Sequence, residues 1–195
     1  MTNNTLCQQY LSLLYQGAKG HQSLKRSEQN TIPLSYGEIL YPGVDRLLAE
    51  VVLSEKDVFL DLGSGLGKVV LQVFLKTAVK KACGIEILPD LHQQSLAAAK
   101  KVQEDLSGFF TGGRQLNFVL GSFLTFPLTE ATVVLIGSPC FTPKMLDSLS
   151  KNIDSSPHIH TVFSLRPLCA LEKLAFKKAI RIEGSWDTTL CYIYQ

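Results

Sequence analysis

The feature that most constrains this sequence is a glycine-rich turn between two apolar runs. The stretch from Asp61 to Gly67 reads Asp-Leu-Gly-Ser-Gly-Leu-Gly. It follows a short buried-strand pattern at 57–60 and precedes an apolar run at 68–77 that is typical of a helix packed on a sheet. Because glycine has no Cβ, it allows positive φ and lets the backbone approach a ligand closely. The pattern therefore predicts a strand, a ligand-binding turn and a helix.

A second acidic residue, Glu86, ends the next apolar run at 81–85. It lies about 20 residues beyond the turn, where a carboxylate accepts hydrogen bonds from a ribose diol in nucleotide-binding folds. The glycine spacing is G-x-G-x-G rather than the dinucleotide pattern G-x-G-x-x-G, and Asp61 stands directly before it. A carboxylate at that point repels a pyrophosphate and attracts the ammonium of an amino-acid tail. The two acids therefore favour S-adenosylmethionine over NAD as the cofactor.

An alternative interpretation keeps the turn but removes the ligand. In it the glycines serve only the fold, and Asp61 is the N-cap of the following helix. A glycine motif alone is weak evidence, whereas strand, glycines, helix, second strand and acid in this order are much stronger. We therefore expect this region to bind a cofactor.

Length and composition fit one α/β domain. A chain of 195 residues is long enough for one full core and too short for two domains of ordinary size. No apolar run approaches the roughly 18 residues that a membrane span needs. Residues 1–15 lack the basic start and unbroken apolar centre of a secretory signal. We expect a cytoplasmic protein, with a nuclear or secreted destination left open.

Metal and nucleic-acid binding have little support. The five cysteines form no C-x-x-C pair, and His158 and His160 have no thiol or carboxylate nearby in the sequence. We therefore expect no metal. A net charge of +2 is small for a dedicated nucleic-acid binder. A short basic segment at 19–26 leaves nucleosome or nucleic-acid contact open but weakly supported.

Strand patterns alternate with helix patterns along the chain. The expected strands are 57–60, 81–85, 115–120, 131–136, 158–165, 180–182 and 190–194. The expected helices are 5–16, 44–53, 68–77, 89–106 and 142–153. Alternation predicts an α/β fold with a mostly parallel sheet covered on both faces, and the closely spaced last two strands predict an antiparallel pair. We expect a helical extension and loop at 1–34 and the main domain at 35–195.

Several motifs resemble the disruptor-of-telomeric-silencing family of lysine methyltransferases. They are Ser35–Glu38, Asp61–Gly67 with the following Val69–Val73, Gly84–Glu86, Gly121–Phe123, Phe141–Pro143 and Gly184–Tyr192. The resemblance covers residues 31 to 194 of the sequence. It implies the class I, seven-stranded methyltransferase fold, S-adenosylmethionine as cofactor with S-adenosylhomocysteine as product, and a narrow channel for the lysine of a protein substrate.

The resemblance also implies roles for single residues at the cofactor. The expected cofactor-binding residues are Tyr36, Glu38, Asp61, Gly63, Gly65, Gly67, Glu86, Ser122, Phe123 and Ser138. Among these, Asp61 and Gly63 would contact the methionine moiety. Glu86 would hold the ribose, and Phe123 would stack on the adenine. The segment before the core, with Tyr36, would close over the cofactor. Four of these residues, Asp61, Glu86, Ser122 and Ser138, follow strand ends, and ligands of such sheets bind beyond the carboxyl ends of the strands.

A second set of residues faces the substrate. The expected catalytic residues are Tyr36, Ser138, Trp186 and Tyr192. The three aromatic residues would wall a channel that disfavours a lysine ammonium by desolvation, and Ser138 would orient the amine. The stretch Gly137–Pro139 stands where the family has Asn-Asn-Phe. It is similar instead to lysine methyltransferases of mitochondrial carrier and ATP-synthase subunits, which points away from a nucleosome substrate.

Three other functions stay open from the sequence. The same fold serves small-molecule methyltransferases, for which residues 1–40 would form a lid. The departure at Gly137–Pro139 fits a cofactor-binding interaction module without turnover. An NAD-dependent oxidoreductase is the weakest alternative, because of the charge of Asp61.

Overall fold

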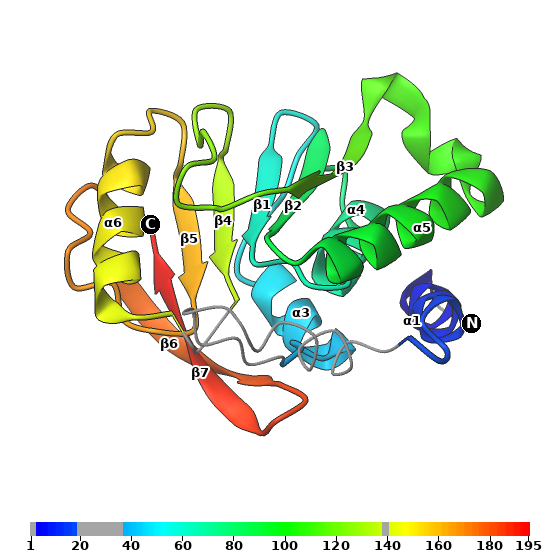
Figure 1. Ribbon diagram of the computed structural model, residues 1–195, viewed down its shortest axis with the longest axis horizontal. Coiled ribbons are helices and arrows are strands. Elements are labelled where there is room, and N and C mark those ends of the chain that lie inside the picture. Colours follow the sequence, from blue (N-terminus) through cyan, green and yellow to red (C-terminus); the bar gives the residue numbers. More distant parts are fainter. Residues whose placement is uncertain (1–2, 19–36, 138–140) are drawn as a thin grey trace.

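A computed structural model describes residues 3–18, 37–137 and 141–195 (Figure 1). The strands are β1 (Val58–Leu62), β2 (Lys81–Glu86), β3 (Gln115–Leu120), β4 (Val133–Ile136), β5 (Thr161–Ser164), β6 (Phe176–Glu183) and β7 (Thr188–Tyr194). They form one seven-stranded sheet in the order β3-β2-β1-β4-β5-β7-β6. Strands β1 to β5 are parallel, while β7 runs antiparallel to both β5 and β6. The expected mostly parallel sheet with a C-terminal antiparallel hairpin is confirmed.

Helices cover both faces of the sheet. They are α1 (Asn3–Leu14), α3 (Tyr41–Leu48), α4 (Lys68–Lys76), α5 (Pro89–Asp105) and α6 (Pro143–Asp154). Alternate residues of a strand point to opposite faces, so Phe59 of β1 packs with α3, α4 and α5, whereas its neighbour Leu60 packs with α6. Figure 1 shows α6 beside β5, and α4 and α5 near β2 and β3. No helix in the described parts of the chain is long and apolar enough to cross a bilayer.

The strand order reverses at β1, on the carboxyl edge of the sheet. β2 and β3 lie to one side of β1, and β4 and β5 lie to the other. Leu62 at the end of β1 is in register with Ile136 at the end of β4, so the two chains diverge from adjacent points. Ligands of open α/β sheets bind where the order of strands reverses in this way. The glycine turn leaves the sheet at this position.

Among the helical elements, α3 and a 3₁₀ helix differ from the sequence-based expectation. α3 begins at Tyr41 and ends at Leu48 rather than spanning 44–53, because Pro42 suits the first turn of a helix. Val52, which lies within the expected helix, follows the observed one and is 91% exposed. A 3₁₀ helix, η1 (Ser107–Gly113), was not predicted, since its glycine-bearing sequence carries no helical periodicity.

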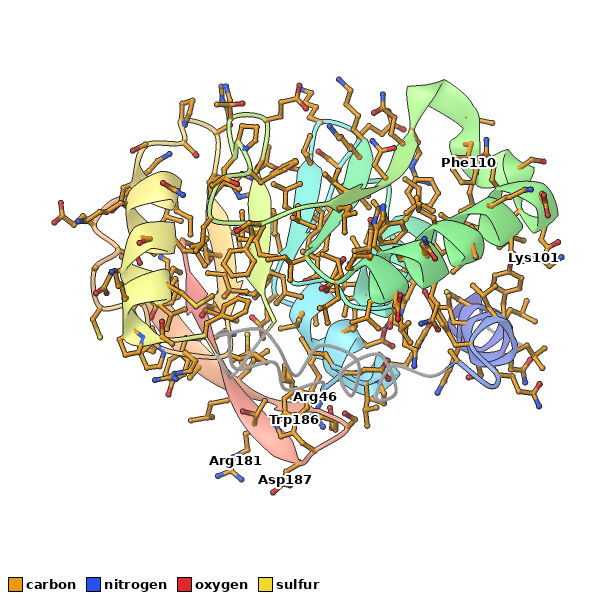
Figure 2. All side chains as sticks on the ribbon, viewed as in Figure 1. Arg46, Lys101, Phe110, Arg181, Trp186 and Asp187 are labelled. Atoms are coloured by element: carbon orange, nitrogen blue, oxygen red, sulfur yellow. The ribbon has the colours of Figure 1, made fainter. Side chains whose placement is uncertain are left out.

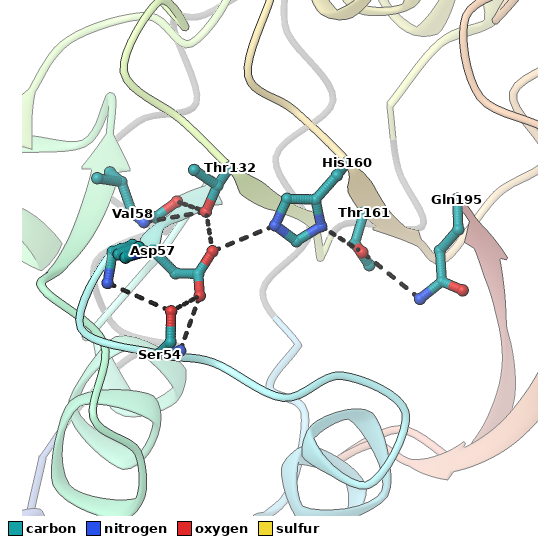
Figure 3. Close-up of polar contacts among 8 residues, drawn as sticks. Ser54, Asp57, Val58, Thr132, His160, Thr161 and Gln195 are labelled. Atoms are coloured by element: carbon teal, nitrogen blue, oxygen red, sulfur yellow. Dashed lines mark hydrogen bonds and ion pairs between the residues drawn. The ribbon is translucent and has the colours of Figure 1, made fainter.

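Asp57 ties together three segments at the amino end of the sheet (Figure 3). Its carboxylate accepts hydrogen bonds from the backbone N–H and the hydroxyl of Ser54, both at 2.7 Å, and from Thr132 Oγ1 at 2.9 Å. His160 Nε2 lies 3.2 Å from Asp57 Oδ1. The expectation that no carboxylate lies near the histidines is therefore wrong. The pairing of β1, β4 and β5 brings Asp57 and His160 together, which no local pattern reveals.

We expect this network to set stability in acid. Burial raises the pKa of Asp57, but hydrogen bonds from Ser54, His160 and Thr132 outweigh it and lower the pKa to about 2. Because this lies below the ordinary value of 3.8, the ionised carboxylate stabilises the fold by about 2 kcal/mol above pH 4, and this stabilisation is lost as the pH falls through 2.

Denaturant unfolding of the wild type and of Asp57→Asn from pH 2 to 7 measures this effect. The difference in the free energy of unfolding should be largest above pH 4 and should shrink as the pH falls toward 2, where the Asp57 carboxyl becomes about half protonated. A difference that stays constant across the range would contradict the assignment.

Candidate active site

The glycine turn has the conformation that its sequence predicts. Gly63, Gly65 and Gly67 have φ values of 89°, 54° and 81°, which side chains with a Cβ rarely adopt. The turn folds back on β2, because Gly63 N–H donates to the carbonyl of Ile85 at 2.9 Å. The N-cap of α4 is Gly67. The alternative interpretation of Asp61 as that N-cap is therefore wrong, and its carboxylate has another use.

Glu86 ends β2 and holds the turn with its carboxylate. Oε2 accepts a hydrogen bond from Gly65 N–H at 2.8 Å, and Oε1 accepts from the N–H groups of Ile87 and Leu88, both at 2.9 Å. The side chain is buried. A carboxylate has about four lone-pair sites, so it can accept further bonds from a ribose diol. Glu86 thus shapes the turn and also presents an acceptor at the sheet edge.

Asp61 lies inside β1 and is 3% exposed. Burial raises its pKa to about 7, and the negative charge of Glu86 adds to the effect, while no described hydrogen-bond donor or basic side chain offsets it. A Cβ on Gly137, just after β4, would lie 3.7 Å from Asp61 Oδ1, so the carboxylate lies beside the end of that strand. A pair of buried acids without a cation favours a ligand group with positive charge.

The segment after β3 reaches the same edge, because the N–H of residue 121 donates to the carbonyl of Glu86 at 2.8 Å. Ser122 is half-buried, and its hydroxyl accepts a hydrogen bond from the backbone within its own turn. Phe123 is buried, and its ring centroid lies 4.4 Å from that of Phe141. A Cβ on the first glycine of the turn would lie 3.3 Å from the Phe141 ring. Two aromatic rings therefore lie beside the glycine turn.

Two close contacts beneath the turn could not be found by sequence reasoning. A Cβ on Gly84 would lie 2.6 Å from Ser64 Cβ, and one on Gly67 would overlap the ring of Phe118. Gly84 and Phe118 are paired in register between β2 and β3. The one available signal was a glycine inside a predicted buried strand, which often marks close approach of another segment.

We expect Gly84→Ala to destabilise the fold by about 1–3 kcal/mol, because the added methyl group fits only if Ser64 and the turn move. Gly108→Ala is the matched control, since a Cβ at Gly108 meets nothing within 4 Å. Thermal unfolding of both variants gives the comparison. Equal melting temperatures would rule out the packing explanation.

Two expected substrate residues, Tyr36 and Ser138, lie outside the described residues. Trp186 lies at the tip of the β6–β7 hairpin and is 39% exposed (Figure 2). Its ring covers two glycines, since a Cβ at Gly37 would overlap the ring and a Cβ at Gly184 would lie 2.8 Å from it. The indole therefore joins the hairpin to the segment that leads into α3.

Tyr192 lies farther along β7, in register with Ser164 at the end of β5. It packs against the same apolar cluster as Phe141. Tyr192 lies four extended residues, about 13 Å, from the start of β7, which is the end of the strand nearer to Trp186. A channel shared by Trp186 and Tyr192 stays a prediction.

Glu38 connects three elements. Its Oε2 lies 2.7 Å from the ammonium of Lys68 in the first turn of α4. Its backbone carbonyl accepts from Ser185 N–H at 2.8 Å, and its own N–H donates to Ser185 Oγ at 3.0 Å. Glu38 therefore joins the segment before α3 to α4 and to the β6–β7 hairpin. Within the described residues, no group of three His, Cys, Asp or Glu side chains could hold a metal ion.

Sequence comparisons match most of the chain to one family. A family model described as "Histone methylation protein DOT1" matches residues 19–184. An H3 lysine-79 specific histone-lysine N-methyltransferase of Drosophila melanogaster is 28% identical over 173 residues, which cover 86% of this chain and 9% of that protein. A protein-lysine N-methyltransferase of Saccharolobus islandicus is 33% identical over 91 residues, which cover 47% of this chain and 52% of that protein. The chain thus spans only part of these relatives.

Solved structures match the fold. An RNA methyltransferase from Salinibacter ruber, in complex with S-adenosyl-L-homocysteine, superposes with a TM-score of 0.55 at 22% sequence identity. The match covers 84% of this chain and 92% of that one. At this identity the likeness concerns the fold alone. The chain has the class I, Rossmann-like methyltransferase fold, as the sequence predicted.

Proposed function

This chain belongs to the DOT1 family of histone methylation proteins, and on that premise we propose that it transfers methyl groups from S-adenosylmethionine to lysine side chains of a protein, with S-adenosylhomocysteine as product. The observation that supports this most is the carboxylate of Asp61. It is buried beside a second acid, at a glycine turn, without a described basic partner. A cationic ligand would shift such a group toward its ionised form at neutral pH.

The residues at and beside the glycine turn fit this cofactor. Asp61 would hold the ammonium of the methionine moiety, and the glycine turn would let the backbone approach it. Glu86 would accept hydrogen bonds from the ribose, and Phe123 would stack on the adenine. When bound, the cofactor supplies a methyl group on a positively charged sulfur. An NAD pyrophosphate would instead bring negative charge toward Asp61 and be repelled.

The chain's own task is to present a neutral amine. A lysine with a pKa near 10.4 is neutral in only about one molecule in two thousand at pH 7, which corresponds to about 4.6 kcal/mol. Apolar walls lower this barrier, because desolvation disfavours the ammonium. We assign this role to Trp186 and Tyr192 together with Tyr36, and the orientation of the amine to Ser138.

The relatives are named for different protein substrates. The Drosophila relative is named for lysine 79 of histone H3, whereas the Saccharolobus relative is named only for protein lysine. The net charge of +2 is low for a protein that holds nucleosomes. The stretch Gly137–Pro139 resembles methyltransferases of mitochondrial carrier and ATP-synthase subunits. We therefore propose a lysine in a protein other than the intact nucleosome.

Methyl-labelled S-adenosylmethionine tests the function on three substrate pools: nucleosomes, free histones and a histone-free protein extract. We expect label in protein, recovered after hydrolysis as methyl-lysine, and strongest in the histone-free pool. Asp61→Asn, which should not bind the cofactor, is the control. Label only in small metabolites would indicate a small-molecule methyltransferase. Binding of S-adenosylhomocysteine without transfer to any pool would indicate a module without turnover.

A further inference from the structure

The N-terminal helix reaches the cofactor turn through one side chain. Leu11 of α1 is buried in the cluster formed by α3 and α4, and α1 lies beside α4 and α5 in Figure 1. Tyr15 directly follows the helix, and its Oη donates to the carbonyl of Leu66 at 2.8 Å. Leu66 belongs to the glycine turn and is 2% exposed. A buried carbonyl needs a donor, and here it comes from 51 positions earlier in the chain.

The ring of Tyr15 also supports the residue that follows the turn. The Lys68 ammonium lies 5.1 Å from the ring centroid and 2.7 Å from Glu38 Oε2. Lys68 is in the first turn of α4, where the helix dipole disfavours a positive charge. The aromatic face and the carboxylate both offset this cost. Tyr15 thus contacts both sides of Gly67, the last glycine of the turn.

These contacts continue to the substrate side. Glu38 pairs with Lys68 through its side chain and with Ser185 through its backbone. Ser185 precedes Trp186, the candidate channel residue. A displacement of Tyr15 would therefore shift the glycine turn first and then, through Lys68 and Glu38, the β6–β7 hairpin.

We propose that Tyr15 is a positioning residue of the cofactor site, which fixes the Leu66 carbonyl and Lys68 and so holds the glycine turn in its binding geometry. The identity of the ligand rests on the proposed function. Burial raises the pKa of the Tyr15 hydroxyl, and the negative charge of Glu38 raises it further. The hydroxyl consequently stays protonated and remains a donor to Leu66.

Tyr15→Phe tests the hydroxyl, because it keeps the ring over Lys68 and removes only the bond to Leu66. The loss of one net hydrogen bond corresponds to about a threefold to tenfold change in an equilibrium constant. We expect the Kd for S-adenosylhomocysteine, measured by calorimetry, to rise by this factor. The KM for S-adenosylmethionine should rise in parallel, while kcat at saturating cofactor stays close to that of the wild type.

Tyr10→Phe is the matched control on the same helix. Tyr10 Oη donates to Asp105 Oδ2 of α5 at 3.1 Å, at an exposed position. Both variants remove one anchor of α1, but only Tyr15→Phe removes a bond to the turn. Their melting temperatures report the general loosening of α1, and only the Tyr15 variant should change the Kd.

The outcomes separate this inference from the proposed function. If the wild type binds S-adenosylhomocysteine and Tyr15→Phe binds it equally well, the positioning role is wrong and the function stands. A rise in Kd of the same size in Tyr10→Phe would also overturn the role, because it would reflect the loss of helix anchoring. If the wild type itself does not bind, the proposed function fails and the inference fails with it.

Discussion

Asp61→Asn should strongly weaken cofactor binding and at the same time stabilise the free protein above neutral pH. Burial raises the pKa of Asp61 to about 7, and Glu86 contributes to the rise. Because this lies above the ordinary value of 3.8, the protonated carboxyl stabilises the folded state. That stabilisation is complete below pH 4 and is lost as the pH rises through 7. Full ionisation costs of the order of 4 kcal/mol, which asparagine avoids.

Binding should change in the opposite direction. Asparagine has nearly the shape of aspartate but no charge to pair with an ammonium, and removing one partner of a buried ion pair costs about 3–5 kcal/mol. The Kd for S-adenosylhomocysteine should therefore rise at least about a hundredfold. In the wild type, affinity should increase as the pH rises to about 7 and then level off, because only the ionised Asp61 pairs with the ligand.

Two measurements check this pair of effects. Calorimetry with S-adenosylhomocysteine gives the affinity, and denaturant unfolding at pH 5.5 and 8.5 gives the stability of the free protein. The variant should be more stable than the wild type at pH 8.5, with a smaller difference at pH 5.5. A variant that binds normally, or one that is equally destabilised at both pH values, would show that Asp61 has another role.

The sequence predicted the types of elements well because local signals decide them. Buried parallel strands appear as continuous apolar runs, and the expected range 131–136 contains β4, whose four residues are all buried. Pro89 starts α5 and Thr142 caps α6, as their residue types indicate. β6 was predicted only at 180–182, since its first four residues are exposed at the sheet edge and lack an apolar pattern.

The contacts that shape the site could not be predicted from the sequence. The position of Glu86 beyond the turn was predicted from spacing, but its three hydrogen bonds to backbone N–H groups were not. The fit of Ser64 against Gly84 depends on the turn folding back over β2. The bond from Tyr15 to Leu66 joins segments with no shared pattern. Periodicity shows which face a residue occupies, whereas the folded chain decides what it meets there.

Glu86→Ala should destabilise the protein by several kcal/mol, unlike Asp61→Asn. The substitution leaves the N–H groups of Gly65, Ile87 and Leu88 without their acceptor, and each buried unpaired group costs about 1–3 kcal/mol. Thermal unfolding should therefore show a much lower melting temperature. The sequence alone would have assigned Glu86 to the ligand and predicted an intact fold.

Glu86→Gln separates the two roles of this carboxylate. Glutamine keeps one acceptor oxygen, so it should destabilise the turn less than alanine does, yet it removes the negative charge that helps to raise the pKa of Asp61. The pH at which affinity for S-adenosylhomocysteine rises should therefore move below that of the wild type, even though the ribose is held more weakly. Calorimetry across pH 5 to 8 measures this midpoint. If the midpoint does not move while the affinity falls, Glu86 serves the ribose without tuning Asp61, and the two acids act independently.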